Sequence, residues 1–326
     1  MSAAPTISVL MTSYNRERYI AASIDSVLAQ TCADFELLIT DNQSTDRSVE
    51  IAQDYARRDA RIRVVVNESN LGQFGNRNRA AQLARGAFLK YHDSDDIMYP
   101  HCLATMLAPL QAEPRAGFAL SNSIYWIGGP CPMLLTPRMC YQREFLGQGM
   151  FMCGPSGALF RADVFRALGG FSDRGVGSDH LFWLHACAQV NVLLVSADLF
   201  WYRVHEGQEF QSEHAGREYA IVPGACWQAL TAATCPLTAD EIEQAKRNLV
   251  YSFLKLTYRD LRRGRWGVAQ RRFHHFALSA REWLRYLRMP QRDLFAGTPR
   301  DAQGDFLVPD WSTYRAPPST RDERVA

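Results

Sequence analysis

Four short apolar runs, separated by segments with helical spacing, constrain the fold of this 326-residue chain more than any other feature. The runs are Ile7–Met11, Phe35–Ile39, Ile62–Val66 and Ala87–Tyr91. Each has the length of a buried strand, and the segments between them place apolar residues on one helical face. Strands that alternate with helices form a parallel sheet with helices on both faces. The sequence therefore predicts an α/β fold built on a Rossmann-like sheet.

Polar loops follow three of these strands. They are Thr12–Asn15 after the first strand, Asp41–Asp46 after the second and Asp93–Asp96 after the fourth. Because ligands bind beyond the carboxyl ends of the strands in such sheets, we expect the three loops to converge on one crevice. The first loop lacks the Gly-x-Gly-x-x-Gly pattern, which makes a dinucleotide oxidoreductase the weakest functional alternative.

The third of these loops is strongly acidic. Residues 90–96 read Lys-Tyr-His-Asp-Ser-Asp-Asp, with three carboxylates in four positions. Carboxylates this close repel each other unless a positive charge lies between them. Mg²⁺ or Mn²⁺ accepts such oxygen ligands, usually one or two from the protein and the rest from phosphate and water. The cluster predicts a metal–diphosphate site, against the alternative of a solvated acidic turn.

Composition limits the other classes of function. The net charge of +2 gives no general attraction to nucleic acid, and no apolar stretch approaches the ~18 residues of a membrane span. The eight cysteines include no Cys-x-x-Cys pair, so we expect reduced thiols and no zinc site. With no secretion signal at the N-terminus, these features predict a cytoplasmic protein.

The second half of the chain is less regular. The expected helices are His101–Leu110, Ala162–Leu168 and Asp179–Ala188, the expected strands are Gly117–Ser121, Val190–Val195 and Leu199–Val204, and residues 128–137 are expected to form a loop. From Glu241 to Met289 the pattern predicts two helices joined by a turn between Gly264 and Gly267. The second of these is expected to carry Phe273, Phe276, Trp283, Leu284 and Leu287 on one face.

Five motifs, in this order, resemble family 2 of the glycosyltransferases, which have the GT-A fold and mostly invert the anomeric centre. They are Thr12–Arg16, Asp41–Asp46, Asn70–Gly72 with Arg77-Asn78, Asp93–Asp96, and Ser178-Asp179 followed by Tyr202–His205. The resemblance covers residues 7–212. It implies a GT-A domain over residues 1–212, with a nucleotide-sugar half over about 1–98 and an acceptor half over about 99–212. Residues 213–316 would be a helical C-terminal region, and residues 317–326 a disordered tail.

The resemblance also implies a role for each residue of the site. Thr12, Tyr14 and Asn15 would line the base pocket, Asp41 would bind uracil or ribose, Arg77 and Asn78 would lie beside the donor nucleotide, and Asp93 and Ser94 would contact the donor. Asp93, Asp95 and His205 would contact Mn²⁺ or Mg²⁺, and Asp179 would be the general base. Ser178 stands where the family often has an acidic residue.

Each of these roles has a structural alternative. Asp41 and Asp46 could cap a helix, Asn78 could be an ordinary helix residue, His205 a surface histidine, Arg203 an ion-pair partner, and Asp179 the N-cap of its helix. The same choice applies to the basic segment from Lys246 to Arg300, which carries 14 Lys/Arg against three acidic residues. It could contact an anionic membrane, or its helices could pack on the catalytic domain.

The predicted activity is displacement at the sugar C1, which moves one sugar from a nucleotide-diphosphate sugar, a UDP-sugar first, to a saccharide or lipid-linked acceptor. Processive relatives carry Gln-x-x-Arg-Trp, whereas here Arg262 precedes Arg265-Trp266, so we expect a single addition, in cell-surface polysaccharide assembly. Two alternatives remain. A nucleotidyltransferase would need a Gly-rich basic loop after the first strand, and a degenerate GT-A binding protein would not need the carboxylates. No nucleic-acid partner is expected.

Overall fold

The computed structural model describes residues 4–121, 131–147, 149–151, 153–172, 177–195, 199–206, 208 and 219–294. Its centre is an eight-stranded sheet with the order β3-β2-β1-β4-β8-β6-β9-β7. The strands are β1 (Ile7–Ser13), β2 (Phe35–Asp41), β3 (Ile62–Val66), β4 (Phe88–Asp93), β6 (Ala116–Ser121), β7 (Met133–Leu135), β8 (Ala158–Arg161) and β9 (Asn191–Val195). A separate pair joins β5 (Ile97–Met98) to β10 (Phe200–Trp201).

The sheet is mixed, so the prediction of a parallel sheet is only partly correct. Strands β1 to β4 are parallel to one another, as expected. Strand β8 runs antiparallel to both β4 and β6, and β7 runs antiparallel to β9. Strand β8 was missed because it follows directly on the 3₁₀ turn Pro155–Gly157, whose Gly and Pro residues read as a loop.

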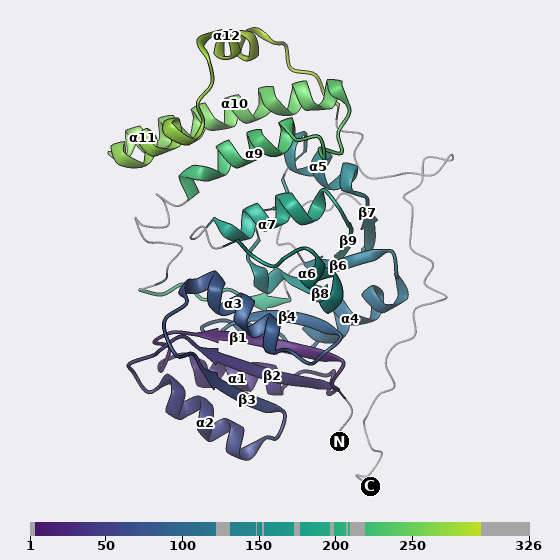
Figure 1. Cartoon of the computed structure of the whole chain (residues 1–326), viewed down its shortest axis with the longest axis vertical. Helices are drawn as coiled ribbons and strands as arrows, with labels where there is room; N and C mark the ends of the chain where they lie inside the picture. Colours follow the sequence, from purple (N-terminus) through teal and green to yellow (C-terminus); the bar gives the residue numbers. More distant parts are fainter. Residues whose placement is uncertain are drawn as a thin grey trace.

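Helices cover both faces of the sheet (Figure 1). One face packs on α1 (Ile20–Leu28), α2 (Ser48–Arg58) and α4 (Cys102–Ala112). The other packs on α3 (Gly72–Leu83), α5 (Pro137–Phe145), α6 (Ala162–Ala167) and α7 (Ser178–Cys187). Alternate residues of β1 serve the two faces, since Val9 and Met11 belong to the first cluster and Leu10 to the second. Strands β1, β2 and β4 are buried on both sides, which explains their mostly apolar sequences, whereas the edge strand β3 is only partly buried.

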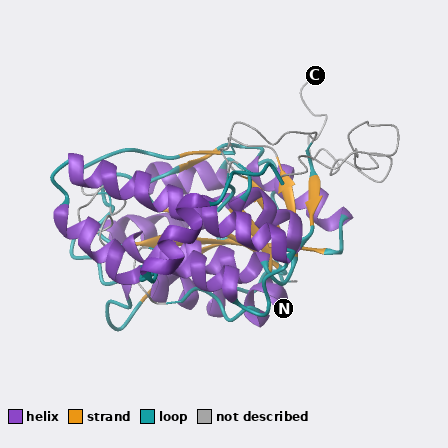
Figure 2. Cartoon of the chain, turned by 90° about the horizontal axis from the view of Figure 1, so that it is seen from above, coloured by secondary structure: helices purple, strands orange, loops and turns teal. Residues whose placement is uncertain are grey.

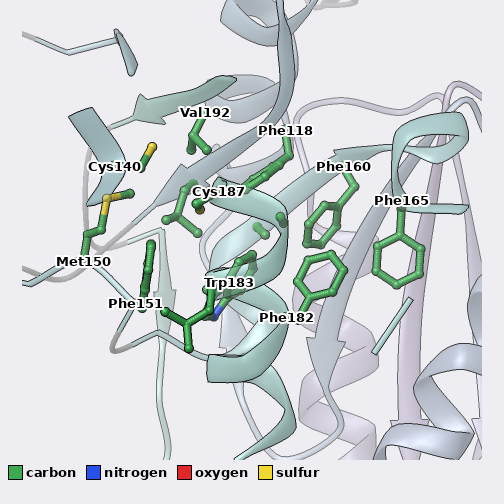
Figure 3. Packing of buried hydrophobic residues seen from close by; sticks show 14 of the residues in the cluster. Phe118, Cys140, Met150, Phe151, Phe160, Phe165, Phe182, Trp183, Cys187 and Val192 are labelled. Carbon is green, nitrogen blue, oxygen red and sulfur yellow. The ribbon is translucent and has the colours of Figure 1, made fainter. Parts of the chain in front are cut away.

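An aromatic cluster fixes α7 on the sheet (Figure 3). Trp183 of α7 stacks on Phe160 of β8 with ring centroids 5.9 Å apart, and Phe182 lies 5.7 Å from the same ring. The indole N–H of Trp183 donates to the carbonyl oxygen of Cys153 at 2.8 Å. Because α7 is held by these large rings, the residues of its first turn, including Asp179, have a defined position.

The C-terminal half contains more helices than the sequence predicted. Residues 131–137 of the expected loop include β7 and the start of α5, and α9 (Val222–Thr231) lies in the expected helical region 213–316 but was not predicted as a separate helix. The first expected helix is confirmed as α10 (Ala239–Arg262). The second expected helix is divided into two helices, α11 (Trp266–His275) and α12 (Ala280–Arg288). Ser279 and Glu282 form a capping box that starts α12. The break leaves Phe273, Leu284 and Leu287 exposed instead of on one buried face.

Helices α9 to α12 lie together at one end of the molecule (Figure 1), and seen from that side helices cover most of the sheet (Figure 2). Helices α9 and α10 share a core cluster with the sheet, whereas a separate cluster that includes Phe253 and Tyr286 joins α10 to α12. Cys226 and Leu230 of α9 and Ala245 of α10 belong to the same cluster as the aromatic residues around α7. Glu241 of α10 accepts hydrogen bonds from Arg138 at 2.8 Å and Gln142 at 2.5 Å, both on α5. Packing on the catalytic domain is therefore correct for α9 and α10, whereas the domain division at residue 212 stays a prediction. The expected tail, 317–326, lies outside the described residues.

All eight cysteines are free, and Cys102, Cys140, Cys187 and Cys226 are buried. None of the helices in the described part of the chain has the length and apolar character needed to cross a bilayer.

Replacing Glu36 by Ala is expected to lower the free energy of unfolding by about 1–3 kcal/mol at neutral pH, because the change leaves the buried Ser8 hydroxyl and the Arg85 backbone N–H without their carboxylate acceptor. The buried Glu36 carboxylate accepts from Ser8 Oγ at 2.6 Å and from the backbone and side-chain N–H groups of Arg85 at 2.8 and 2.9 Å. Burial raises its pKa, but these bonds and Arg63 outweigh burial, so the pKa lies below its ordinary value. The stabilisation is therefore present above the pKa of the unfolded chain and is lost as the pH falls through the folded pKa.

Urea unfolding at several pH values measures this effect. Glu50→Ala is the matched control, since Glu50 is an exposed carboxylate on α2 that pairs with Arg47 at 3.0 Å. We expect little change in that variant, because exposed ion pairs contribute little. Equal midpoints for the two variants would contradict a stabilising role for the Glu36 network.

Candidate active site

The carboxyl ends of β1, β2 and β4 lie side by side. The strand register pairs Ser13 with Asp41 and Thr12 with Asp93. The loops that follow these strands therefore begin at one edge of the sheet, as the sequence predicted.

Hydrogen bonds from short polar side chains join the first two loops. The Asn15 backbone N–H donates to Ser44 Oγ at 2.8 Å, and its side-chain oxygen accepts from the N–H of Thr45 at 2.8 Å. Asn15 has a φ of 53°, a left-handed conformation that Asn tolerates better than most residues. Asp41 accepts from the N–H and hydroxyl of Ser44 at 2.8 and 2.6 Å. The Asn15 and Asp41 side chains thus shape the loops, while Tyr14 is 46% exposed and Thr12 is half-buried.

Asp46 is not the N-cap residue of α2, which is Arg47, but its carboxylate still has a structural role. Its carboxylate accepts from the backbone N–H of Ser48, at the start of α2, at 2.9 Å and from that of Glu17 at 3.0 Å. It joins the start of α2 to the first loop.

The acidic loop is neutralised by basic side chains from distant segments. Asp93 accepts from Arg77 of α3 at 2.5 Å and from Ser156 Oγ at 3.2 Å. Asp95 lies 2.9 Å from Arg16 Nε and 3.0 Å from His205 Nε2. The positive charge that the carboxylates require comes from Arg16 and Arg77, which lie on separate segments, and His205 adds a hydrogen-bonding contact to Asp95.

The third carboxylate of this loop, Asp96, anchors the segment that carries His205. Its Oδ1 accepts from the backbone N–H of Arg203 at 3.0 Å, and the Arg203 side chain donates to the Asp95 carbonyl oxygen at 2.7 Å. The Arg203 guanidinium also stacks over the rings of Tyr19 and Trp201, at 5.2 and 4.8 Å. Among the described residues Arg203 forms no ion pair, so it positions the loop through a carbonyl oxygen and two aromatic rings and not as the ion-pair partner of the alternative.

Burial and neighbouring charge separate the pKa values within this loop. Burial raises the pKa of Asp96, and the charge of Asp93 raises it further. Burial also raises the pKa of Asp93, but Arg77 and the other neighbours outweigh that effect and hold it below its ordinary value. At neutral pH Asp93 is therefore ionised.

Asp95 and His205 fit a divalent cation as two of its ligands. Two cis ligands at the ~2.1 Å distance of an octahedral Mg²⁺ site lie about 3 Å apart, as do Asp95 Oδ2 and His205 Nε2. The described residues contain no group of three or more His, Cys, Asp or Glu side chains that could hold a metal ion. A cation here would need further oxygen ligands, which phosphate and water supply in such sites.

Asp179 lies in the first turn of α7. Gly177 is the N-cap residue, so the alternative that Asp179 caps the helix is wrong. One carboxylate oxygen accepts from the backbone N–H of His180 at 2.7 Å, and the Tyr219 hydroxyl is 3.5 Å from both oxygens. Burial raises the pKa of Asp179 to about 6, although these hydrogen bonds and Arg77 oppose the shift. A carboxyl with a pKa near neutrality suits proton transfer at physiological pH.

Of the predicted residues, Asn78 has a different environment from the expected one. Its amide donates to the Phe171 carbonyl oxygen at 2.7 Å, and its oxygen accepts from the Phe171 N–H at 2.9 Å. Both ends of the amide are used in this bond pair, which fits the structural alternative. Ser94 is buried in the acidic loop.

Four residues of the site were not predicted individually. Arg16 was visible as the last residue of the first motif, and Ser156 lies within the expected acceptor half, residues 99–212, without having been singled out. Tyr219 left no signal, because it approaches Asp179 from 40 residues further along the chain. Lys90 is fully buried, donates to the Tyr91 carbonyl oxygen at 3.1 Å and contacts that of Ser156. Burial lowers its pKa.

The architecture and the clustered acidic loop define the GT-A class of glycosyltransferase folds. S. aureus TarS 1-349 in complex with UDP-GlcNAc has a TM-score of 0.58 and 19% identity, covering 86% of this chain and 79% of that one. The mannosyltransferase PcManGT from Pyrobaculum calidifontis, in complex with GDP-Man and Mn2+, has a TM-score of 0.53 and 16% identity, covering 88% and 79%.

Sequence comparison gives the family. Residues 8–169 match the model for glycosyl transferase family 2, and the chain belongs to this family. The uncharacterized glycosyltransferase EpsJ of Bacillus subtilis is 44% identical over 94 residues, 29% of this chain and 27% of its own. The Escherichia coli UDP-Glc:alpha-D-GlcNAc-diphosphoundecaprenol beta-1,3-glucosyltransferase WfgD is 44% identical over 123 residues, 38% of this chain and 44% of its own. The match thus spans less than half the length of either relative.

Proposed function

We propose that this protein is an inverting, metal-dependent glycosyltransferase that moves one sugar from a nucleotide-diphosphate sugar, a UDP-sugar first, to a hydroxyl acceptor. The observation that supports this proposal best is the Asp95–His205 pair, 3.0 Å apart, at the edge of the sheet where Arg77 meets Asp93. Family membership and the nucleotide-sugar complexes of the structural neighbours TarS and PcManGT support the donor class.

The donor would lie along the carboxyl ends of β1, β2 and β4. Thr12, Tyr14 and Asn15 border the space for the base, with Asp41 on the neighbouring strand. Arg77 is the cation nearest the centre of this edge, since it bonds to Asp93 and also lowers the pKa of Asp179. It therefore joins the donor half electrostatically to the proposed base.

Asp95 and His205 would hold the metal, which when bound would neutralise the charge that develops on the diphosphate leaving group. Arg16 and Arg203 position these two residues, Arg16 through the Asp95 carboxylate and Arg203 through the Asp95 carbonyl. Mn²⁺ or Mg²⁺ fits this donor set of one carboxylate and one imidazole completed by oxygen ligands.

Asp179 would act as the general base. Its carboxylate accepts the proton of the acceptor hydroxyl as the hydroxyl oxygen attacks C1 of the sugar. The bond from C1 to the diphosphate oxygen breaks on the opposite side, and the configuration at C1 inverts. Tyr219, whose pKa is raised by burial, stays protonated and orients the Asp179 carboxylate by donating to it.

The acceptor is proposed to be a saccharide or a lipid-linked saccharide, in cell-surface polysaccharide assembly on the cytoplasmic side. The printed name of WfgD describes transfer to a diphosphoundecaprenol-linked GlcNAc by that relative. A lipid-linked acceptor would bring the enzyme to a membrane surface. The half from residue 99 to 212, which contains Ser156 and Asp179, is the proposed acceptor side.

A panel of nucleotide-sugars, tested by thermal shift with and without Mn²⁺, tests the proposed function. We expect one donor to stabilise the protein against thermal unfolding, and only when Mn²⁺ is present. A ligand at 100 times its dissociation constant adds about 2.7 kcal/mol to the free energy of unfolding. The same donor with acceptor should release a free nucleoside diphosphate. Release of pyrophosphate would instead indicate a nucleotidyltransferase, and neither stabilisation nor donor hydrolysis would indicate a binding protein.

A further inference from the structure

The turn between α10 and α11 forms an exposed basic corner, which consists of Lys255, Tyr258, Arg262, Arg263, Arg265 and Trp266. Lys255, Tyr258 and Arg262 are spaced by three and four residues and so lie on one face of α10. Figure 1 shows this turn at one end of the C-terminal helical layer. The corner is one exposed part of the basic segment, at the end of α10 where the chain turns into α11.

The charge of the corner has no local counter-charge. Residues 250–279 contain seven Lys/Arg and one carboxylate, Asp260. Asp260 is buried and pairs with the buried Arg272 at 2.7 Å. Within the described part of the chain, no ion pair is present at the four cations of the corner.

Several arginines elsewhere on the protein are paired. The exposed Arg47 and Arg115 and the half-buried Arg61 each pair with a carboxylate two or three residues away, at 3.0, 2.6 and 2.7 Å. The unpaired cations of the corner are therefore available to an anionic partner.

Large aromatic side chains lie among these cations. Trp266 is 69% exposed and Tyr258 is 64% exposed, and the Arg262 guanidinium lies 6.0 Å from the Tyr258 ring centroid. Exposed aromatic rings among arginines are favourable where apolar and charged surroundings meet, as they do at lipid headgroups. In bulk water the same rings gain nothing from their exposure.

The corner is a rigid platform. The Asp260–Arg272 pair joins the end of α10 to α11, and the Arg265 N–H donates to the Asp260 carbonyl oxygen at 2.9 Å. Gly264 has a φ of 71°, a left-handed conformation that favours Gly and makes the sharp turn possible. The cations and rings are thus presented together without a large ordering cost on binding.

We propose that the basic corner docks the protein on an anionic bilayer surface, with the cations at lipid phosphates and Trp266 and Tyr258 in the headgroup region. Nucleic acid would attract the same charge, but the chain has a net charge of only +2 and no recognition motif. Aromatic rings and cations around one turn fit the interface of a bilayer.

Docking through this corner would also orient the active site. The 3₁₀ turn η3 (Tyr219–Ile221) packs against α11, and the Tyr219 hydroxyl is 3.5 Å from the Asp179 carboxylate. One structural element thus separates the docking helix from the proposed base. This orientation rests on the proposed role of Asp179, whereas the docking itself does not.

Co-sedimentation of the full chain with vesicles tests the proposal. The vesicles contain either phosphatidylcholine alone or phosphatidylcholine with phosphatidylglycerol, at low and high salt. Each cation at an anionic surface contributes about five-fold in affinity, so the double change Arg262→Gln/Arg265→Gln is expected to weaken binding to the anionic vesicles about 25-fold. Binding should fall with salt, since the Debye length shortens. Trp266→Ala should weaken binding but leave the salt dependence unchanged.

The matched control is Arg57→Gln/Arg58→Gln on α2, which removes the same charge from another exposed surface. Binding of this control should equal that of the unmodified protein. Equal binding to neutral and anionic vesicles, no binding at low salt, or equal losses in both double variants would overturn the proposal. Preferential binding to a nucleic-acid duplex, lost in the corner variant, would overturn it in favour of nucleic acid. Donor binding by thermal shift should be unchanged in every variant, which separates this test from that of the proposed function.

Discussion

Replacing Asp179 by Asn is expected to lower the transfer rate by about two to four orders of magnitude and to leave donor affinity unchanged. The amide cannot accept the proton of the acceptor hydroxyl at neutral pH, but it keeps the size of the carboxylate and its oxygen can still accept from the His180 N–H. The measurement is kcat for transfer, together with donor affinity by titration. Loss of donor binding would instead make Asp179 a structural residue, and a near-normal rate would require another base.

A pH profile and a control variant give two further tests of the role of Asp179. Since the pKa of Asp179 is raised to about 6, the rate of the unmodified protein should rise as the pH increases through about 6 and level off above it. This limb should be absent in Asp179→Asn. Asp163→Asn is the matched control, because Asp163 is an exposed carboxylate in the first turn of α6 that accepts from the next backbone N–H at 2.9 Å, as Asp179 does. Its rate and pH profile should be unchanged.

Replacing Asp95 by Asn is expected to remove most of the metal-dependent affinity for a nucleoside diphosphate. We expect a loss of at least about 100-fold, because changes to residues behind the ligands alone cost 10–100-fold. His205→Ala should reduce the affinity in the same direction, since Asp95 and His205 are the two proposed protein ligands. Titration of UDP with and without Mn²⁺ measures the loss.

The control for this second prediction is Asp46→Asn. Asp46 accepts from two backbone N–H groups in the neighbouring loop and has no proposed metal contact. Circular dichroism of all variants checks that the fold is retained. An unchanged Mn²⁺-dependent affinity in Asp95→Asn would refute the metal assignment, while a loss of metal-independent affinity alone would indicate that Asp95 acts through Arg16.

The first half of the fold was predicted correctly because the sequence signals for its strands lie within short segments. Each of β1 to β4 is a continuous apolar run followed by turn-forming residues, and both signals lie within about ten residues. The second half was read less well. Strand β8 is four residues long and pairs with β4 and β6, which are distant in sequence, so nothing within it indicates its partners. The break between α11 and α12 was missed because the apolar spacing continues across Ser279.

In the candidate site, too, features set by neighbouring residues were predicted and contacts between distant segments were not. Asp93 and Asp95 stood out in the sequence as an acidic cluster after a strand, whereas Asp179, Arg77 and His205 were expected at the site from the family resemblance. Which carboxylate each basic side chain meets was not predicted, since Arg16, Arg77 and His205 approach the acidic loop from three separate segments. Asn78 was predicted from its motif alone, and only its contacts with Phe171 show that both ends of its amide are used in packing α3.

By itself, the amino-acid sequence determined the α/β class, the edge of the sheet that carries the polar loops, and the acidic residues found there, because periodicity and charge spacing are properties of neighbouring residues. Only the tertiary structure decided which cation meets which carboxylate, and that Tyr219 of the C-terminal region reaches Asp179. It also decided which arginines are paired and which are left exposed at the basic corner. These outcomes depend on long-range packing, in which burial changes the free energy of a charge far more than its sequence neighbours do.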